Sequence, residues 1–93
     1  MRQITKRAKA AFDTNTPFKE SNTQVIIMRD VTELYLFGNR IARKFGNEIK
    51  ITLAGWNTNT TRERLNAFAS VYTKQGQAYI NGKAVSNTEW VTL

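Results

Sequence analysis

The amino-acid sequence predicts an α+β fold with an N-terminal helix, a four-strand antiparallel meander, one capped helix and a C-terminal β-hairpin. Apolar residues recur at helical spacing near the start of the chain and again after residue 64, and they alternate with polar residues in between. Gly-Asn and Asn-Gly pairs separate strand-like segments, which is typical of tight hairpins. We expect residues 1–93 to form a single domain, because a chain of this length can build one hydrophobic core.

Residues 3–12 are predicted to form a helix. Its apolar face consists of Ile4, Ala8, Ala11 and Phe12, and its other sides carry the cations Arg2, Lys6, Arg7 and Lys9. A docking helix with a solvated basic side is the favoured interpretation, and phosphate contact through Lys6 and Arg7 is the alternative. Residues 13–23 are rich in turn-forming residues, so we expect a loop that Phe18 anchors.

Residues 24–53 are predicted to form the meander. Its strands are expected at residues 24–28, 32–37, 40–44 and 48–53. Gly38-Asn39 and Gly46-Asn47 lie between successive strands and suit two-residue turns. With turns of this length, Glu33 lies opposite Lys44, and Lys44 lies opposite Ile49.

This register distributes the meander side chains over two faces. One is a core face, made of Val31, Tyr35, Phe37, Ala42, Ile49, Ile51 and Leu53. The other is mixed, with the apolar residues Leu34, Leu36, Ile41 and Phe45 beside Arg43, Glu48, Lys50 and Thr52. A face of this composition needs a partial cover, for which the N-terminal helix, the last strands and a second copy of the chain, as a homodimer, are the candidates.

Residues 55–66 mark a change from strand to helix, because the apolar spacing changes there from two residues to three or four. Thr60 is predicted to cap the helix, with Glu63 closing a capping box. The helix is expected to run to about Tyr72. Further on, Asn81-Gly82 between strand-like flanks predicts a hairpin, and the chain end from Trp90 to Leu93 predicts a last strand.

Arg62 and Arg64 would lie in the first turn of the capped helix, where positive charge opposes the helix dipole. Capping alone explains the motif and is the favoured interpretation. The alternative is an anion site in which free helix amides, Thr61, Arg62 and Arg64 hold a phosphate or a carboxylate. Trp56, just before the helix, is expected in the core, with an interface position as the alternative.

The composition argues against several classes of function. The chain has no cysteine and no histidine, which removes disulfides, thiolate chemistry and the commonest metal ligand. Nucleophilic Ser-His and Cys-His sites are therefore impossible, and no glycine-rich phosphate loop is present. We expect no enzymatic activity, no cofactor and no metal. No apolar run approaches the ~20 residues that span a bilayer, so we expect a cytosolic protein without membrane contact.

Four segments are distinctive when taken together: Ser21-Asn22-Thr23, residues 36–44, residues 55–66 and residues 79–83. The second contains Gly-Asn-x-Ile-Ala-x-Lys, and the third reads Gly-Trp-x-Thr-x-Thr-Thr-x-Glu-Arg-Leu-Asn. In these motifs the chain resembles a family of small proteins encoded in tailed bacteriophage genomes. The resemblance supplies no activity and no cofactor. It implies a phage origin, the cytoplasm of an infected bacterial host, and a role in host takeover or defence evasion.

Fourteen Lys and Arg residues against seven Asp and Glu give a net charge of +7, which favours a polyanionic or acidic partner. We therefore expect a binding protein that acts on nucleic acid or on a host protein that handles it. The candidate binding residues are Lys6, Arg7, Arg43, Lys50, Trp56, Thr61, Arg62 and Arg64. One alternative is an inhibitor of a host enzyme without nucleic-acid contact, to which the mixed sheet face, Trp56 and Trp90 point. The other is a minor structural protein of the virion.

Overall fold

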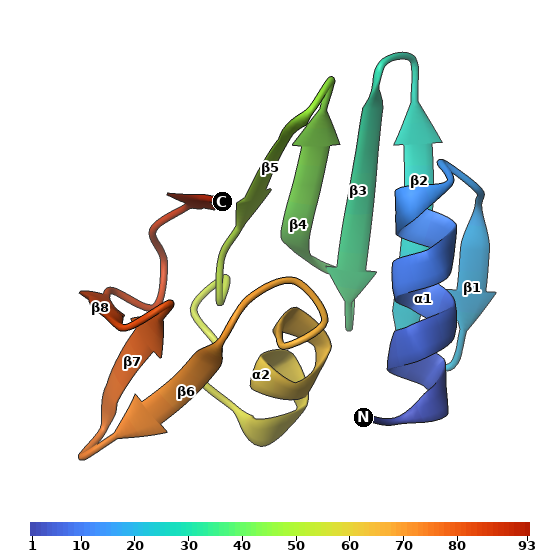
Figure 1. The fold of residues 1–93 in the computed structure, drawn as a ribbon. Coiled ribbons are helices and arrows are strands. Elements are labelled where there is room, and N and C mark those ends of the chain that lie inside the picture. The colour runs from blue at the N-terminus through green and yellow to red at the C-terminus, as the bar shows by residue number, and fades with distance from the viewer.

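The computed structural model describes the whole chain, residues 1–93, as two helices and two antiparallel sheets (Figure 1). Helix α1 spans Gln3–Asp13 and helix α2 spans Asn59–Leu65. The α+β class and the N-terminal helix are confirmed. In α1, Ala8 and Phe12 are buried one turn apart, so the predicted apolar face is the one that packs against the sheet.

The larger sheet has six strands in the order β1-β2-β3-β4-β5-β9. They are β1 (Phe18–Glu20), β2 (Thr23–Met28), β3 (Val31–Leu36), β4 (Asn39–Phe45), β5 (Glu48–Ile51) and β9 (Val91–Thr92). Strands β2 to β5 are the predicted meander, and β9 is the predicted last strand, paired with β5. The expectation of a loop over residues 13–23 is wrong in part, because β1 pairs with β2 as an edge strand. Phe18 in β1 does pack against the core.

The smaller sheet has three strands: β6 (Val71–Lys74), β7 (Gln77–Ile80) and β8 (Lys83–Val85). Strands β7 and β8 form the predicted hairpin. Its turn residues Asn81 and Gly82 both have positive φ, as the Asn-Gly pair predicts. Strand β6 was not predicted, because its first residues were assigned to the preceding helix.

Helix α2 ends at Leu65 rather than near Tyr72, and the side chain of Asn66 explains why. The Asn66 amide donates to the carbonyl oxygens of Arg62 (2.7 Å) and Val71 (2.8 Å), and its oxygen accepts from the Val71 amide (2.9 Å). Asn66 thus caps the helix end and holds the chain that starts β6. An asparagine can satisfy backbone groups in this way where a helix-forming residue could not.

The hairpin between β3 and β4 turns one residue earlier than predicted. Its turn residues are Phe37 and Gly38, with φ of 50° and 77°, rather than Gly38 and Asn39, so that Leu36 pairs with Asn39. Two central residues with positive φ match the twist of a two-residue hairpin. The next turn lies at residues 46–47 as predicted, and Lys44 does pair with Ile49.

The early turn moves the partners of β3 by two residues, and a bulge in β4, where Ile41 has no partner in β3, reverses one of the two. Glu33 consequently lies opposite Arg43, and the predicted pair of Glu33 with Lys44 is wrong. The early turn and the bulge together displace the β3 register by one residue over most of its length. A displacement of one residue moves every side chain of a strand to the other face of its sheet.

The predicted faces of β3 are therefore exchanged. Leu34 and Leu36, expected on the mixed face, are buried in the core, whereas Val31 and Tyr35 lie on the opposite face and Phe37 is exposed in the turn. On β4, Ile41 is also buried. The remaining predicted core residues of the meander, Ala42, Ile51 and Leu53, are buried, and Ile49 is half-buried.

Helix α1 lies over β1 and β2 on one face of the larger sheet, and α2 lies beyond the end of β4, beside β6 (Figure 1). Lys44 Nζ donates to the carbonyl oxygen of Phe12 (2.8 Å), which fixes the side of β4 that faces α1. A single cluster of 15 buried apolar residues includes members of α1, α2 and both sheets. The rings of Phe12 and Phe68 meet edge to face, with centroids 5.0 Å apart, where α1 meets the turn after α2.

Candidate binding surfaces

The face of the larger sheet that carries no helix is the first candidate surface. Because Lys44 contacts α1, its neighbours Arg43 and Phe45 point to the opposite side. Lys50 pairs with Arg43 across the strands and shares that side. We name this surface the open sheet face and define it by Glu33, Tyr35, Arg40, Arg43, Phe45, Lys50 and Trp90.

A buried carboxylate lies at the centre of the open sheet face. Glu33 is only 1% exposed, and its carboxylate accepts from Arg40 Nη1 (2.7 Å) and from the Tyr35 hydroxyl (2.9 Å). Burial, together with this hydrogen bond to Glu33, raises the pKa of Tyr35. The hydrogen bond to Glu33 likewise raises the pKa of Arg40. Glu33 therefore holds Arg40 and Tyr35 in place, and Arg40 lies over the ring of Trp90 at 5.7 Å.

The other two cations of the open sheet face are available to solvent. The side chains of Arg43 and Lys50 are 49% and 44% exposed, and their nearest carboxylates, Glu33 and Glu48, lie 3.9 Å and 3.7 Å away. Both contacts are longer than a hydrogen bond, and the pair of Lys50 with Glu48, in which both side chains are exposed, is weak. Phe45 and Trp90 are exposed on the same face. The face thus presents cations and aromatic rings together.

The cations of α1 lie elsewhere, on the helix-bearing side of the molecule. Arg7 is paired with Glu20 of β1 at 2.5 Å. This hydrogen-bonded pair raises the pKa of Arg7 and lowers that of Glu20. Lys6 is exposed and makes no ion pair. The sheet separates Lys6 and Arg7 from the open sheet face.

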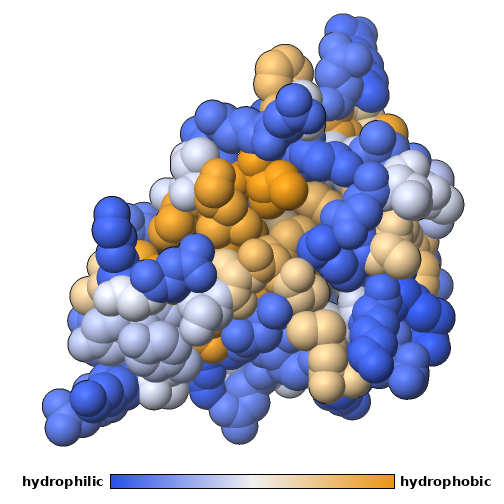
Figure 2. All heavy atoms as spheres, in the orientation of Figure 1, coloured by the Kyte–Doolittle hydropathy of each residue, from blue (hydrophilic) through white to orange (hydrophobic).

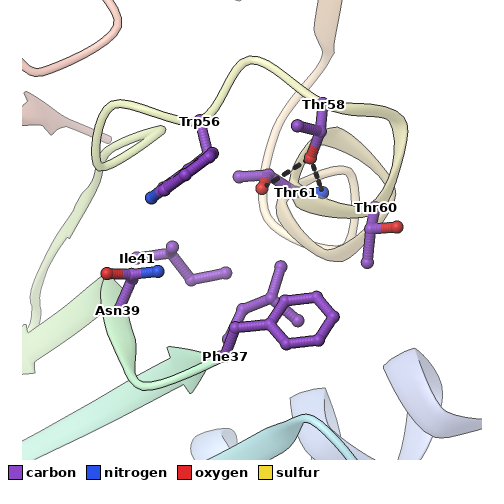
Figure 3. Close-up of a pocket in the computed structure, with 8 residues that line it drawn as sticks. Phe37, Asn39, Ile41, Trp56, Thr58, Thr60 and Thr61 are labelled. Atoms are coloured by element: carbon purple, nitrogen blue, oxygen red, sulfur yellow. Dashed lines mark hydrogen bonds between the residues drawn. The ribbon is translucent and has the colours of Figure 1, made fainter.

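The start of α2 is capped by Thr58, not by Thr60. The Thr58 hydroxyl accepts from the amide of Thr61 (3.2 Å) and also bonds the Thr61 hydroxyl (3.0 Å; Figure 3). Glu63 does not close a capping box. Its carboxylate binds the Arg2 amide at 3.2 Å and the hydroxyl of Thr5 instead. The cap thus lies two residues before the predicted one. Thr61 is buried, and its amide is bonded to Thr58.

The two arginines of the motif lie in the last turn of α2, since the helix has only seven residues. Their charges therefore complement the helix dipole, and the predicted conflict is wrong. Arg62 donates to the backbone oxygen of Asn57 (2.9 Å) and to side-chain oxygens of Asn57 and Asn59. Arg64 is 2% exposed. Thr61, Arg62 and Arg64 therefore do not converge on a common point where an anion could bind.

Arg64 is the centre of a buried polar network. It donates to Thr23 Oγ1 (3.0 Å), Thr5 Oγ1 (3.1 Å), Asn22 Oδ1 (3.3 Å) and Glu63 Oε1 (2.5 Å). Burial alone would raise the pKa of Glu63, but hydrogen bonds from Thr5, the Arg2 amide and Arg64 outweigh it and lower that pKa. The network joins α1, α2 and the start of β2, so the role of Arg64 in the structure is to hold these elements together.

A hollow between the β3–β4 turn and the start of α2 is the second candidate surface. Its volume is about 440 Å³, and its lining residues are Leu36, Phe37, Asn39, Ile41, Trp56, Thr58, Thr60 and Thr61. Trp56 is 57% exposed at its rim, so the expectation that Trp56 lies in the core is wrong. Figure 3 shows Trp56 and Phe37 at opposite ends of the hollow with Ile41 between them.

The structure brings together only some of the candidate residues. Arg43 and Lys50 are neighbours on one face, Trp56 and Thr61 line one hollow, and Lys6 lies apart from both. Glu33 and Tyr35 of the open sheet face were missed, because the predicted register placed one opposite Lys44 and the other in the core. Phe37 and Asn39 of the hollow were missed for the same reason. The one sequence signal for Phe37 is a large apolar residue directly before a turn glycine.

No helix of the structure is both long and apolar enough to cross a membrane. No group of three or more acidic side chains is placed to hold a metal ion. A protein-family model described as "Kyanoviridae Gp96 protein" matches residues 1–92. No curated protein and no solved structure matches the chain.

Proposed function

The chain belongs to the Kyanoviridae Gp96 protein family, a family of small tailed-phage proteins, and we propose that it is a non-enzymatic binding protein that holds single-stranded nucleic acid on its open sheet face. The strand would be met in the cytoplasm of the infected bacterium. The observation that supports this proposal is the combination of half-exposed Arg43 and Lys50 with exposed Phe45 and Trp90 on one helix-free sheet face.

In such a surface, cations and aromatic rings contact different parts of the nucleic acid. Lys and Arg side chains neutralise the phosphates along the strand, and each base can stack on an aromatic ring whatever its identity. Arg43 and Lys50 lie directly opposite each other on adjacent strands, so together they offer one compact cationic point. Trp90 is already in contact with the Arg40 guanidinium, which keeps its ring at the surface.

A single strand suits this face better than a duplex. Rings that lie on a sheet can stack only on bases that are unpaired and turned outward. Neither helix projects from the open sheet face, so the structure offers no element to enter a groove of a duplex. The +7 net charge would speed the approach of any nucleic acid, but it does not distinguish these cases.

The test is a titration of the protein with a labelled single-stranded oligonucleotide at increasing salt. We expect the logarithm of the association constant to fall linearly with the logarithm of the salt concentration, by about 0.7 for each neutralised phosphate. Replacing Arg43 and Lys50 together by alanine should weaken binding and reduce that slope by about 1.4. Circular dichroism verifies that the double variant remains folded.

The matched control replaces Lys74 and Lys83, two exposed lysines of the smaller sheet, by alanine. It removes the same charge from another surface and should leave the slope nearly unchanged. An equal loss of affinity in both double variants would mean that net charge alone attracts the strand. Either that result or binding that is insensitive to salt contradicts the proposal.

Inhibition of a host protein is the second candidate, and a different surface favours it. Figure 2 shows hydrophobic residues gathered over β5, β9 and the turn after α2, with hydrophilic residues around them. The partly buried apolar residues there are Ile49, Phe68, Ala69 and Val91. A protein interface centred on them would survive nuclease treatment and high salt, losing mainly its association rate as salt rises.

A further inference from the structure

We propose that the hollow between the β3–β4 turn and the start of α2 binds an uncharged nucleobase. This inference goes beyond the proposed function, because none of the residues that line the hollow belongs to the open sheet face, and the hollow would accept a free nucleoside as well as a base of a strand. A volume of about 440 Å³ is within the range of small-molecule sites, about 300–1,000 Å³.

The walls of the hollow favour a flat, neutral ring. Leu36 and Ile41 are buried and form an apolar floor, and none of the eight lining residues is charged. One face of the Trp56 indole is directed across the hollow toward Ile41 (Figure 3). A planar base between them would stack on the indole on one side and contact the aliphatic floor on the other.

Phe37 occupies a turn position at which another residue would make the β3–β4 turn more stable. Its φ of 50° lies in the left-handed region, which a bulky side chain adopts at a cost, and 69% of the residue is exposed. Asparagine before Gly38 would suit this turn better. Phe37 lines the hollow and its ring is exposed, so the ring is available for contact with a ligand.

Three polar groups of the hollow have no hydrogen-bond partner within the protein: the Asn39 carboxamide, the Trp56 indole N–H and the Thr60 hydroxyl. In Figure 3 the indole nitrogen points toward the side on which Asn39 lies. A carboxamide offers a donor and an acceptor side by side, which matches the edge of a base. The hydroxyls of Thr58 and Thr61 on the other side bond each other and are already satisfied.

This arrangement selects against two other ligand classes. A phosphate or carboxylate would find no cation among the lining residues. A purely aliphatic side chain of a partner would displace water from Asn39 and from the Trp56 N–H without replacing its hydrogen bonds. An aromatic heterocycle satisfies both the apolar floor and the polar edge.

The experiment uses a Trp90→Phe background, in which Trp56 is the only tryptophan. We expect its fluorescence to be quenched saturably by adenosine, guanosine, cytidine or uridine, at least one of which should bind. Backbone amide shifts at Ile41 and Thr61 should follow the same titration. Asn39→Ala should weaken binding about fivefold, as loss of one hydrogen bond predicts, whereas Asn47→Ala, at an exposed turn position outside the hollow, should not.

Three results would overturn the inference: no quenching by any nucleoside, equal affinity for ribose alone, or binding of indole as tight as that of nucleosides and unaffected by Asn39→Ala. The last result would assign the hollow to an aromatic side chain of a protein partner. Nucleoside titration of the Arg43→Ala, Lys50→Ala variant separates this inference from the proposed function. Retained nucleoside binding supports the hollow even where strand binding on the open sheet face fails, and lost nucleoside binding counts against it.

Discussion

At the scale of single residues, Arg64 shows how far a side chain's role can differ from the one its charge suggests. It follows a cluster of threonines and belongs to a strongly basic chain, yet its guanidinium is enclosed and its neighbours satisfy it. No buried side-chain polar atom in the structure lacks a partner. A buried cation whose nitrogens are all hydrogen-bonded adds specificity to the arrangement of the elements it joins, and its loss removes several of their hydrogen bonds.

Arg64→Ala should therefore lower the free energy of unfolding by about 3 kcal/mol, since it removes the cation that pairs with Glu63, removes hydrogen bonds to Thr5 and Thr23, and opens a cavity. Arg62 is an arginine of the same helix, but its side chain is half-exposed. Arg62→Ala should therefore lower the free energy of unfolding by less than about 1 kcal/mol. Urea unfolding of the two variants measures the difference. Similar losses would mean that the buried network contributes little.

Glu63 should make the protein sensitive to acid. Its pKa is lowered in the folded state, so its contribution is fully present above the unfolded value of about 4.3 and is lost as pH falls through the folded pKa. Glu63→Gln should be less stable than wild type at pH 7, and the gap between them should narrow below about pH 4. Thermal unfolding across this range tests it, and a gap that stays constant with pH would contradict the assignment.

At the scale of secondary-structure elements, α2 is short and depends on its caps. Thr58→Ala removes the hydroxyl that accepts from the Thr61 amide and should cost about 1 kcal/mol. Thr60→Ala, inside the helix, should change stability by less than about 0.5 kcal/mol. Denaturant titration distinguishes the two substitutions. The reverse order of effects would restore Thr60 as the cap.

The β3–β4 hairpin should become more stable when its turn is made more regular. Phe37→Asn places the preferred residue at a positive φ and should raise the free energy of unfolding by about 1 kcal/mol, because the exposed phenyl ring contributes little packing. Phe45→Asn, an exposed phenylalanine in a strand, should give no such gain. A loss of stability in Phe37→Asn would show that the ring is held by contacts within the protein.

At the scale of the whole molecule, the two sheets share one core. The smaller sheet contributes Val71, Ala78, Ile80 and Val85 to the same cluster that contains Phe12 of α1. The sheets do not pair with each other by strand hydrogen bonds, so this apolar contact is their main connection. We therefore expect both sheets to unfold in one cooperative transition.

Phe12→Ala tests this coupling, because the Phe12 ring is fully buried and contacts Phe68 in the turn that leads to β6. The variant should lose about 3–5 kcal/mol of stability. Amide hydrogen exchange should accelerate in β3 and β7 alike, whereas Phe45→Ala on the open sheet face should leave both nearly unchanged. Faster exchange confined to one sheet would mean that the sheets are independent units.

Much of the fold could be predicted from local pattern. The N-terminal helix, four strands of the meander, the Asn81-Gly82 hairpin and the last strand all follow from spacing and turn residues that act over a few positions. The candidate site was harder to predict. Arg43 and Lys50 could be placed on one face because the turn at residues 46–47 has the expected length. Which side chains of β3 face the core could not be predicted, because the displaced turn at Phe37 and the bulge at Ile41 exchange the two faces of that strand.

By itself, the sequence determined the class of fold, the order of most elements and the absence of cysteine and histidine chemistry, since these depend on residue type and short-range periodicity. Only the tertiary structure decided which face of the larger sheet α1 covers, that Arg64 is enclosed, and that Trp56 stands at the rim of a hollow. The physical reason is that burial is set by contacts between distant segments. A shift of a single residue in strand register costs little locally but reverses the position of every side chain that follows.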